Sequence, residues 1–275
     1  PRSTLFPYTT LFRSALLSAA GDTNELVRAM AVRGLEPIAQ SGGATVRTML
    51  NVRLNDPVRS VRVDAAWALR HQLDTNSTAG TDLIAYLRHN LDQPGGAMQM
   101  GVFQMDRSNL AAALVYFERA VKWDGFSAPL RHALAVAYST DGRGREAVEQ
   151  LQAAVRLAPE DAEYRYLLGL AFSETGNLRG ARDALAEAVR LDPSFARAWY
   201  NLGLAQSALN QPEPAIESLL RAESLDAHSP MFPYARATIL ARLDQVEEAR
   251  LAARRALELR PGFAEAQQLL QALSR

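Results

Sequence analysis

Residues 196–203, ARAWYNLG, and residues 215–222, AIESLLRA, decide the fold of this 275-residue chain. They form one unit of a tandem array, because the chain matches itself when it is shifted by 34 residues. Two columns of that match contain only alanine: Ala113, Ala147, Ala181, Ala215 and Ala249, and then Ala120, Ala154, Ala188, Ala222 and Ala256. A third column holds small residues and a fourth holds apolar ones: Gly101, Ala135, Gly169, Gly203 and Ala237, and then Phe117, Leu151, Leu185, Leu219 and Ala253. A 34-residue period with small residues at fixed places predicts a solenoid of stacked helical hairpins.

Close packing explains why these columns hold small residues. Two antiparallel helices that approach closely need a small residue where their backbones cross, so we expect the glycine and alanine column at the crossing. The turns between the two helices of each hairpin form a fifth column: Ser108, Gly142, Gly176, Asn210 and Asp244. Glycine, asparagine and aspartate tolerate the left-handed backbone conformation that ends many helices, so we expect that conformation in these turns.

The columns together resemble the tetratricopeptide repeat (TPR) family. The resemblance covers residues 94–263 as five repeats in unbroken register: 94–127, 128–161, 162–195, 196–229 and 230–263. Residues 264–275 are similar to the capping helix that such arrays carry. The resemblance implies an all-α, right-handed α-solenoid with a non-catalytic role in binding a protein partner. The fifth repeat departs from the pattern, because Pro233 stands where Trp199 stands one repeat earlier.

The first helices of the array carry residues four positions apart, which share one helix face. The resemblance implies that this face is a concave groove for an extended peptide or a partner helix. Its residues are Met98 and Val102, His132 and Val136, Tyr166 and Leu170, Tyr200 and Leu204, and Tyr234. They are mostly apolar or aromatic, which predicts recognition by apolar contact. The alternative is that the tyrosines belong to the generic scaffold of the family.

Charged clamps are a different mode of recognition in this family. TPR proteins that hold a C-terminal carboxylate use lysine and asparagine in the groove, and here only Asn201 is in such a place. The sequence therefore disfavours a carboxylate clamp.

Residues 15–72 contain a second pattern with the same offset. Asp22, Val27 and Arg28 are repeated as Asp56, Val61 and Arg62, and this motif resembles HEAT-type repeats. The arginine is expected to pair with the aspartate of its own repeat or of the next one. The pair Asp56-Pro57 predicts a helix start with an N-cap carboxylate, and residues 45–54 are expected to form the preceding helix.

Residues 73–93 are expected to link the two arrays, as a polar linker at residues 74–80 followed by a helix over residues 81–91 with Thr81 as N-cap. A HEAT-like pair, a linking helix and a TPR array in this order resemble the C-terminal part of bacterial multihaem c-type cytochromes. That resemblance implies a periplasmic parent protein whose haem domain lies upstream. No haem-attachment motif occurs in this chain, so no haem residue can be carried over.

Residues 4–14, TLFPYTTLFRS, resemble the translation of a common sequencing-library adapter. We therefore expect residues 1–14 to be an artefact and the natural protein to continue upstream of Ala15. The alternative is a genuine amphipathic tail. Because the natural N-terminus is expected to be missing, the choice between a periplasmic and a cytoplasmic location stays open.

The composition excludes several classes of function. Thirty basic and thirty acidic residues give zero net charge, which disfavours a nucleic-acid or anionic-membrane binder. Without cysteine the chain has no thiolate for zinc, haem or nucleophilic catalysis, and no apolar run is long enough to span a membrane. The histidines lack metal-site spacing: His71, His89, His132 and His228. We expect no enzyme activity and no cofactor. Because 29 of the 30 basic residues are arginine and alanine is abundant, we expect a GC-rich bacterial source.

Overall fold

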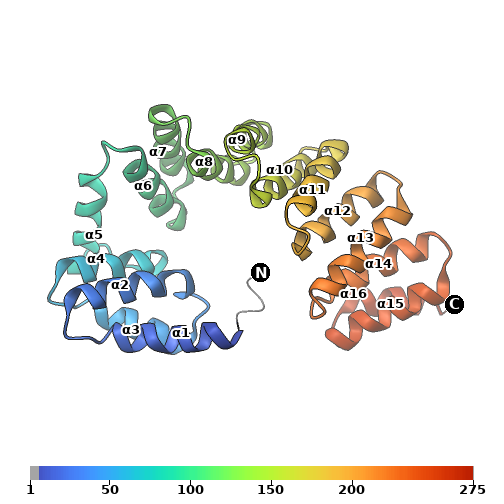
Figure 1. The fold of residues 1–275 in the computed structure, drawn as a ribbon, viewed down its shortest axis with the longest axis horizontal. Coiled ribbons are helices and arrows are strands. Elements are labelled where there is room, and N and C mark those ends of the chain that lie inside the picture. Colours follow the sequence, from blue (N-terminus) through green and yellow to red (C-terminus); the bar gives the residue numbers. More distant parts are fainter. Residues whose placement is uncertain (1–5, 275) are drawn as a thin grey trace. The chain divides into compact units, whose positions relative to one another are not determined.

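A computed structural model describes residues 6–274, with side chains from residue 11 onward. Within that range the chain forms sixteen α-helices and two short 3₁₀ helices, with no strand (Figure 1). The all-α expectation is therefore confirmed. The chain divides into two compact units, residues 1–141 and residues 142–275. We call them the N-terminal and the C-terminal unit, and their boundary falls inside the second expected TPR.

The N-terminal unit contains the first eight helices and both 3₁₀ helices. They are α1 (Phe6–Ala19), α2 (Glu25–Leu35), η1 (Glu36–Ile38), α3 (Gly43–Arg53), α4 (Arg59–Ala68), η2 (Arg70–Gln72), α5 (Thr78–His89), α6 (Pro94–Asp106), α7 (Leu110–Trp123) and α8 (Ala128–Thr140). Helix α3 agrees closely with the helix expected over residues 45–54.

The C-terminal unit continues the hairpin pattern. Its helices are α9 (Gly144–Leu157), α10 (Ala162–Glu174), α11 (Leu178–Leu191), α12 (Ala196–Ala208), α13 (Pro212–Leu225), α14 (Met231–Arg242), α15 (Val246–Leu259) and α16 (Ala264–Ala272). The second helix of every repeat, from α7 to α15, begins 34 residues after its predecessor. The first helices α6, α8, α10 and α12 do the same, and α14 starts one residue late, after Pro230. Helix α16 begins at the residue where the capping helix was predicted.

The five predicted turns all adopt the left-handed conformation. Their φ angles are 59° at Ser108, 75° at Gly142, 78° at Gly176, 58° at Asn210 and 60° at Asp244. Glycine adopts this conformation without strain, whereas the other residue types adopt it at a modest cost in energy. The turn column of the sequence therefore identified one backbone conformation, repeated five times.

The glycine column lies at the helix crossings, as the sequence predicted. A Cβ atom on Gly203 would lie 2.9 Å from Cγ of Leu219, and one on Gly169 would lie 2.6 Å from Cγ of Leu185. Both contacts join the small column to the apolar column of the facing helix. All ten alanines of the two alanine columns have no exposed surface, which fits the dense packing of protein interiors.

Ion pairs join successive helices in the first part of the N-terminal unit. The Arg28 guanidinium donates to both carboxylate oxygens of Asp56, at 2.9 and 3.0 Å. Arg62, one repeat later, donates to Asp82 at 2.8 and 2.7 Å. Each arginine also donates through Nη1 to two backbone carbonyls at the start of its own repeat. Arg28 therefore pairs with the aspartate of the next repeat, one of the two pairings expected, whereas Arg62 pairs with Asp82 on the connecting helix α5, which was not expected.

Two predicted helix starts were wrong by a few residues. Helix α4 begins at Arg59, because the Asp56 carboxylate accepts the backbone N–H of Val58 at 3.0 Å and forms a turn before the helix. Helix α5 begins at Thr78, because the Ser77 hydroxyl accepts the backbone N–H of Gly80 at 3.1 Å and is the N-cap in place of Thr81.

Helix α1 crosses the boundary expected at Ala15 without a break. Residues 1–14 are expected to contribute no selected packing, because apolar residues can rest on apolar surface without having been selected for it. Leu11 and Phe12 are both mostly exposed, and the side chains of Leu5 and Phe6 lie outside the described residues. Among the described helices, none is long and apolar enough to cross a membrane.

Candidate partner-binding face

The residues predicted to bind a partner lie on the first helix of each repeat, and we call this side of those helices the inner face. In the C-terminal unit it is formed by α10, α12 and α14, and α12 contacts both of the others. In the N-terminal unit it is formed by α6 and α8, which also contact each other. The two parts are described separately below.

Each tyrosine of the C-terminal inner face packs on a phenylalanine that precedes or begins the next repeat. The ring centroids are 4.8 Å apart for Tyr166 and Phe195, 5.0 Å for Tyr200 and Phe232, and 4.8 Å for Tyr234 and Phe263. All three pairs are tilted, an arrangement that stabilises aromatic contacts beyond burial alone. Tyr200 therefore joins two repeats, whereas Tyr166 and Tyr234 pack on the last residue of their own repeat, directly before the next helix begins.

Burial differs along this row of tyrosines. Tyr166 is only 7% exposed, whereas Tyr200 and Tyr234 are half-buried. Burial raises the pKa of Tyr166, which the nearby Arg197 guanidinium partly offsets, and burial also raises the pKa of Tyr200. Both phenols therefore stay protonated near neutral pH. Tyr166 offers a partner little surface, and its hydroxyl already accepts a weak hydrogen bond of 3.4 Å from the Asn201 amide.

The apolar surface that remains accessible is provided by the positions four residues further along. Leu204 is 38% exposed on α12, and Leu170 is half-buried on α10. In the N-terminal unit Val136 is exposed, Val102 and His132 are half-buried, and Met98 packs partly against Ala97 and Leu130. All nine predicted residues thus lie on first helices, but they differ widely in how much surface they present.

Polar groups near the C-terminal inner face are mostly committed to neighbours. The Asn201 amide also donates to the backbone carbonyl of Arg197 at 2.8 Å, and Arg242 donates to the Ser207 hydroxyl. Arg236 forms an ion pair with Glu223 at 2.7 Å. Among the described residues, no group of three or more histidine, aspartate or glutamate side chains is arranged to hold a metal ion.

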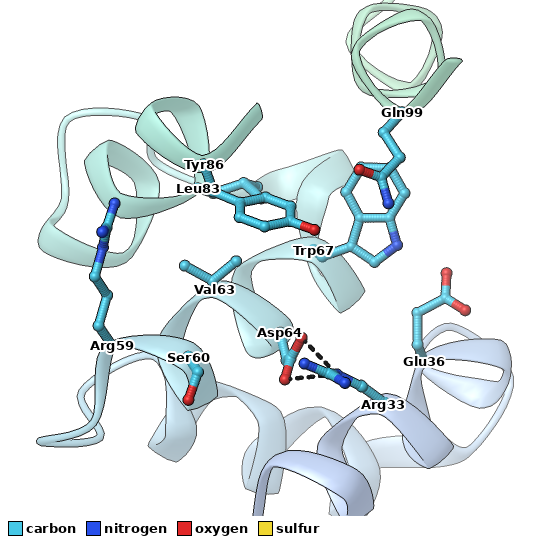
Figure 2. Close-up of a pocket in the computed structure, with 10 residues that line it drawn as sticks. All are labelled: Arg33, Glu36, Arg59, Ser60, Val63, Asp64, Trp67, Leu83, Tyr86 and Gln99. Atoms are coloured by element: carbon cyan, nitrogen blue, oxygen red, sulfur yellow. Dashed lines mark hydrogen bonds and ion pairs between the residues drawn. The ribbon is translucent and has the colours of Figure 1, made fainter. Parts of the chain in front are cut away.

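Sequence reasoning missed a hollow in the N-terminal unit. A pocket of about 580 Å³ opens between α2, α4, α5 and α6 and includes Trp67 and Tyr86 in its wall (Figure 2). Its residues come from four α-helices and from η1, and only Arg33 and Trp67 among them are 34 positions apart, so the repeat alignment gave no signal for it.

Comparison with known proteins identifies the repeats. Models of the tetratricopeptide repeat match residues 104–171, 171–210 and 196–229, so this part of the chain consists of tetratricopeptide repeats. No curated protein matches the chain in sequence.

Solved TPR structures share the fold at low sequence identity. MamA is 24% identical with a TM-score of 0.57, and the match covers 60% of this chain and 96% of MamA. YrrB is described as a TPR protein with an unusual peptide-binding site. It is 17% identical with a TM-score of 0.60, and the match covers 68% of this chain and 97% of YrrB. PilF of Pseudomonas aeruginosa is 24% identical with a TM-score of 0.57, and the match covers 66% of this chain and 82% of PilF. At these identities the likeness establishes the fold alone.

Proposed function

We propose that the chain is a non-catalytic protein-interaction scaffold, and that its C-terminal unit holds a peptide or a helix of a partner on the inner face of α10, α12 and α14. One observation carries the proposal: Leu204 and Tyr200 form an accessible apolar surface on α12. The helices on either side of α12 add Leu170 and Tyr234 to this surface. YrrB shares the fold and is described as having a peptide-binding site, and the proposal assigns this chain the same kind of ligand.

The nine residues of the inner face contribute differently under this proposal. We assign partner contact mainly to Leu204, Tyr200 and Tyr234 in the C-terminal unit, and to Val136, Val102, His132 and Met98 for a contact on the N-terminal unit. Tyr166 supports the face from beneath, because it is buried against Phe195. A substitution of Tyr166 would therefore disturb folding and binding together, so it is a poor test.

Leu204→Glu is a better test, because the chain offers a matched control. Leu204 on α12 is 38% exposed, and Leu220 on α13 of the same repeat is 47% exposed on the second helix. We expect peptides selected from a displayed random library on the parent chain to bind Leu204→Glu at least tenfold more weakly, because a carboxylate would be buried against apolar residues. Leu220→Glu should bind them like the parent.

Ionic strength provides a second readout. Raising the salt concentration from 50 to 500 mM should change the affinity of the selected peptides less than threefold, because screening acts on charges and the face is mainly apolar. Selected peptides that bind Leu204→Glu normally but lose affinity for Leu220→Glu would show that the partner uses the second helices instead.

We also propose that residues 15–72 form a HEAT-like pair, that residues 73–93 connect it to the five repeats, and that residues 264–275 cap the array. Arg28 and Arg62 each donate through Nη1 to two backbone carbonyls at the start of their own unit, and this recurring contact supports the HEAT-like assignment. The same order of elements supports a second candidate function, as the docking portion of a larger periplasmic multihaem cytochrome. The coding sequence upstream of Ala15 tests it: in-frame C-x-x-C-H motifs are expected under the second candidate, and their absence would contradict it.

A further inference from the structure

The pocket of the N-terminal unit has an aromatic wall and a floor made of an ion pair. Figure 2 shows the Tyr86 ring and the Trp67 indole on one side of the cavity, with Arg33 and Asp64 across from them. Val63 and Leu83 add apolar surface beside the Tyr86 ring. Its volume of about 580 Å³ is in the range of pockets that bind small ligands or several residues of a peptide.

Every charged side chain that lines the pocket already has a counter-ion. Arg33 Nε donates to both oxygens of Asp64, at 3.0 and 2.9 Å. The Glu36 carboxylate accepts from Arg70 at 2.8 Å, and Arg59 donates to Asp82 at 3.0 Å. The lining therefore has no uncompensated charge, and a charged ligand would have to compete with one of these pairs. Charge complementarity favours an uncharged ligand.

Several neutral polar groups of the lining lack a hydrogen-bond partner within the described part of the chain. They are the Trp67 indole N–H, the Tyr86 hydroxyl, the Gln99 amide and the Ser60 hydroxyl. Together with the two aromatic rings they suit a flat aromatic group that is followed by peptide amides. Aromatic rings stack favourably on tryptophan and tyrosine, and backbone amides both donate and accept.

An apolar track leads away from the pocket along α2. Leu26, Met30 and Arg33 are spaced i, i+4 and i+7, so they lie on one face of the helix. Leu26 and Met30 are both mostly exposed, and the track continues for about 10 Å from the pocket. A free sugar would leave this apolar surface uncovered, whereas a polypeptide with further apolar residues would cover it.

We propose that this pocket binds an uncharged aromatic residue of a partner polypeptide, whose chain continues over Met30 and Leu26. The site is separate from the inner face of the C-terminal unit and does not depend on the function proposed for that face. A partner with one aromatic anchor would thereby engage the N-terminal unit by stacking and amide hydrogen bonds.

The probe for this site is the blocked peptide acetyl-Ala-Tyr-Ala-Leu-amide, with acetyl-Ala-Ala-Ala-Leu-amide and maltose as comparison ligands. The full chain contains three tryptophans, so its indole N–H signals can be followed individually by NMR and assigned with Trp123→Phe and Trp199→Phe. We expect the tyrosine peptide to shift the Trp67 signal saturably and to leave the signals of Trp123 and Trp199 in place.

Tyr86→Ala has a matched control in the same unit, because Tyr86 is 42% exposed and Trp123, outside the pocket, is 46% exposed. Tyr86→Ala should weaken binding of the tyrosine peptide at least tenfold, and Met30→Glu at least threefold. Trp123→Ala should bind like the parent, and so should Leu204→Glu, which tests the other face.

Three results would overturn the proposal. The first is that the Trp67 signal does not move at the highest soluble concentration of the tyrosine peptide, and the second is that Tyr86→Ala binds this peptide with unchanged affinity. The third is that maltose or the alanine peptide shifts the Trp67 signal as readily as the tyrosine peptide does.

Discussion

The two halves of the chain use one 34-residue period but join successive helices by different physical means. Near the N-terminus the contact is a buried ion pair, in which the Arg28 and Asp56 side chains are 9% and 0% exposed. In the TPR region the contact is a close helix crossing at glycine, with fully buried alanines beside it. A shared period thus specifies which segments are neighbours and leaves open which chemistry holds them together.

The difference makes each half sensitive to a different kind of substitution. A buried ion pair is costly to break, because the remaining partner is left charged and desolvated. A close crossing is costly to fill, because an added side chain must displace a neighbouring backbone or side chain. Since each repeat contacts mainly its neighbours, both effects should stay local.

The largest effect is expected from Asp56→Ala. This change leaves Arg28 and Arg53 without the carboxylate that both contact, at 2.9 and 3.0 Å. Amide hydrogen exchange followed by mass spectrometry should become much faster in α2 and α4, while α11 to α16 should exchange as in the parent. As a control, Asp183→Ala breaks an exposed ion pair with Arg182 and should change exchange little. Equal effects of the two substitutions would contradict the role of the buried pair.

The same pair predicts a dependence on pH. Burial alone would raise the pKa of Asp56, but hydrogen bonds from Arg28 and the Val58 N–H outweigh it and hold the pKa below the ordinary 3.8. A lowered pKa in the folded state means that the carboxylate stabilises the fold above pH 3.8 and loses this effect as the pH falls through the folded-state pKa. The difference in stability between the parent and Asp56→Ala should therefore shrink below about pH 4.

The next largest effect is expected from Gly203→Leu. Its Cβ would lie 2.9 Å from Leu219 and 3.0 Å from the backbone oxygen of Ala215, and overpacking of this kind costs about 1–3 kcal/mol. Thermal unfolding and hydrogen exchange should report the loss in α12 and α13. The control is Gly262→Leu, since a Cβ there meets no atom within 4 Å. Unchanged unfolding of Gly203→Leu would refute the assigned crossing.

The smallest effect is expected from deleting residues 1–14. If this segment is translated adapter, as we propose, selection has not fitted it to the fold, and the exposed Leu11 and Phe12 agree with that. Residues 94–275 should keep their helix content and their hydrogen exchange. Faster exchange in that region after the deletion would contradict the proposal and favour a genuine tail.

Much of the fold was predictable because each repeat occupies the same environment. Glycine, asparagine, aspartate and serine recur at turns that need positive φ, and glycine recurs where a Leu or Phe side chain of the facing helix leaves no room for Cβ. The starts of α4 and α5 were predicted a few residues from their true places. The Asp56 carboxylate accepts the Val58 N–H and forms a turn before α4, and the Ser77 hydroxyl accepts the Gly80 N–H and caps α5 in place of Thr81.

The sequence by itself determined the period, the helix pairs, the left-handed turns and the crossings, since these depend on residue size and backbone conformation, which every repeat shares. Only the tertiary structure decided how much surface each side chain keeps. Tyr166 is buried against Phe195 while Leu204 stays accessible, and Trp67 and Tyr86 lie on the same side of a pocket that is lined by several helices (Figure 2). Exposure and pocket shape depend on which side chains the neighbouring helices bring, and these differ from one repeat to the next, so a period cannot specify them.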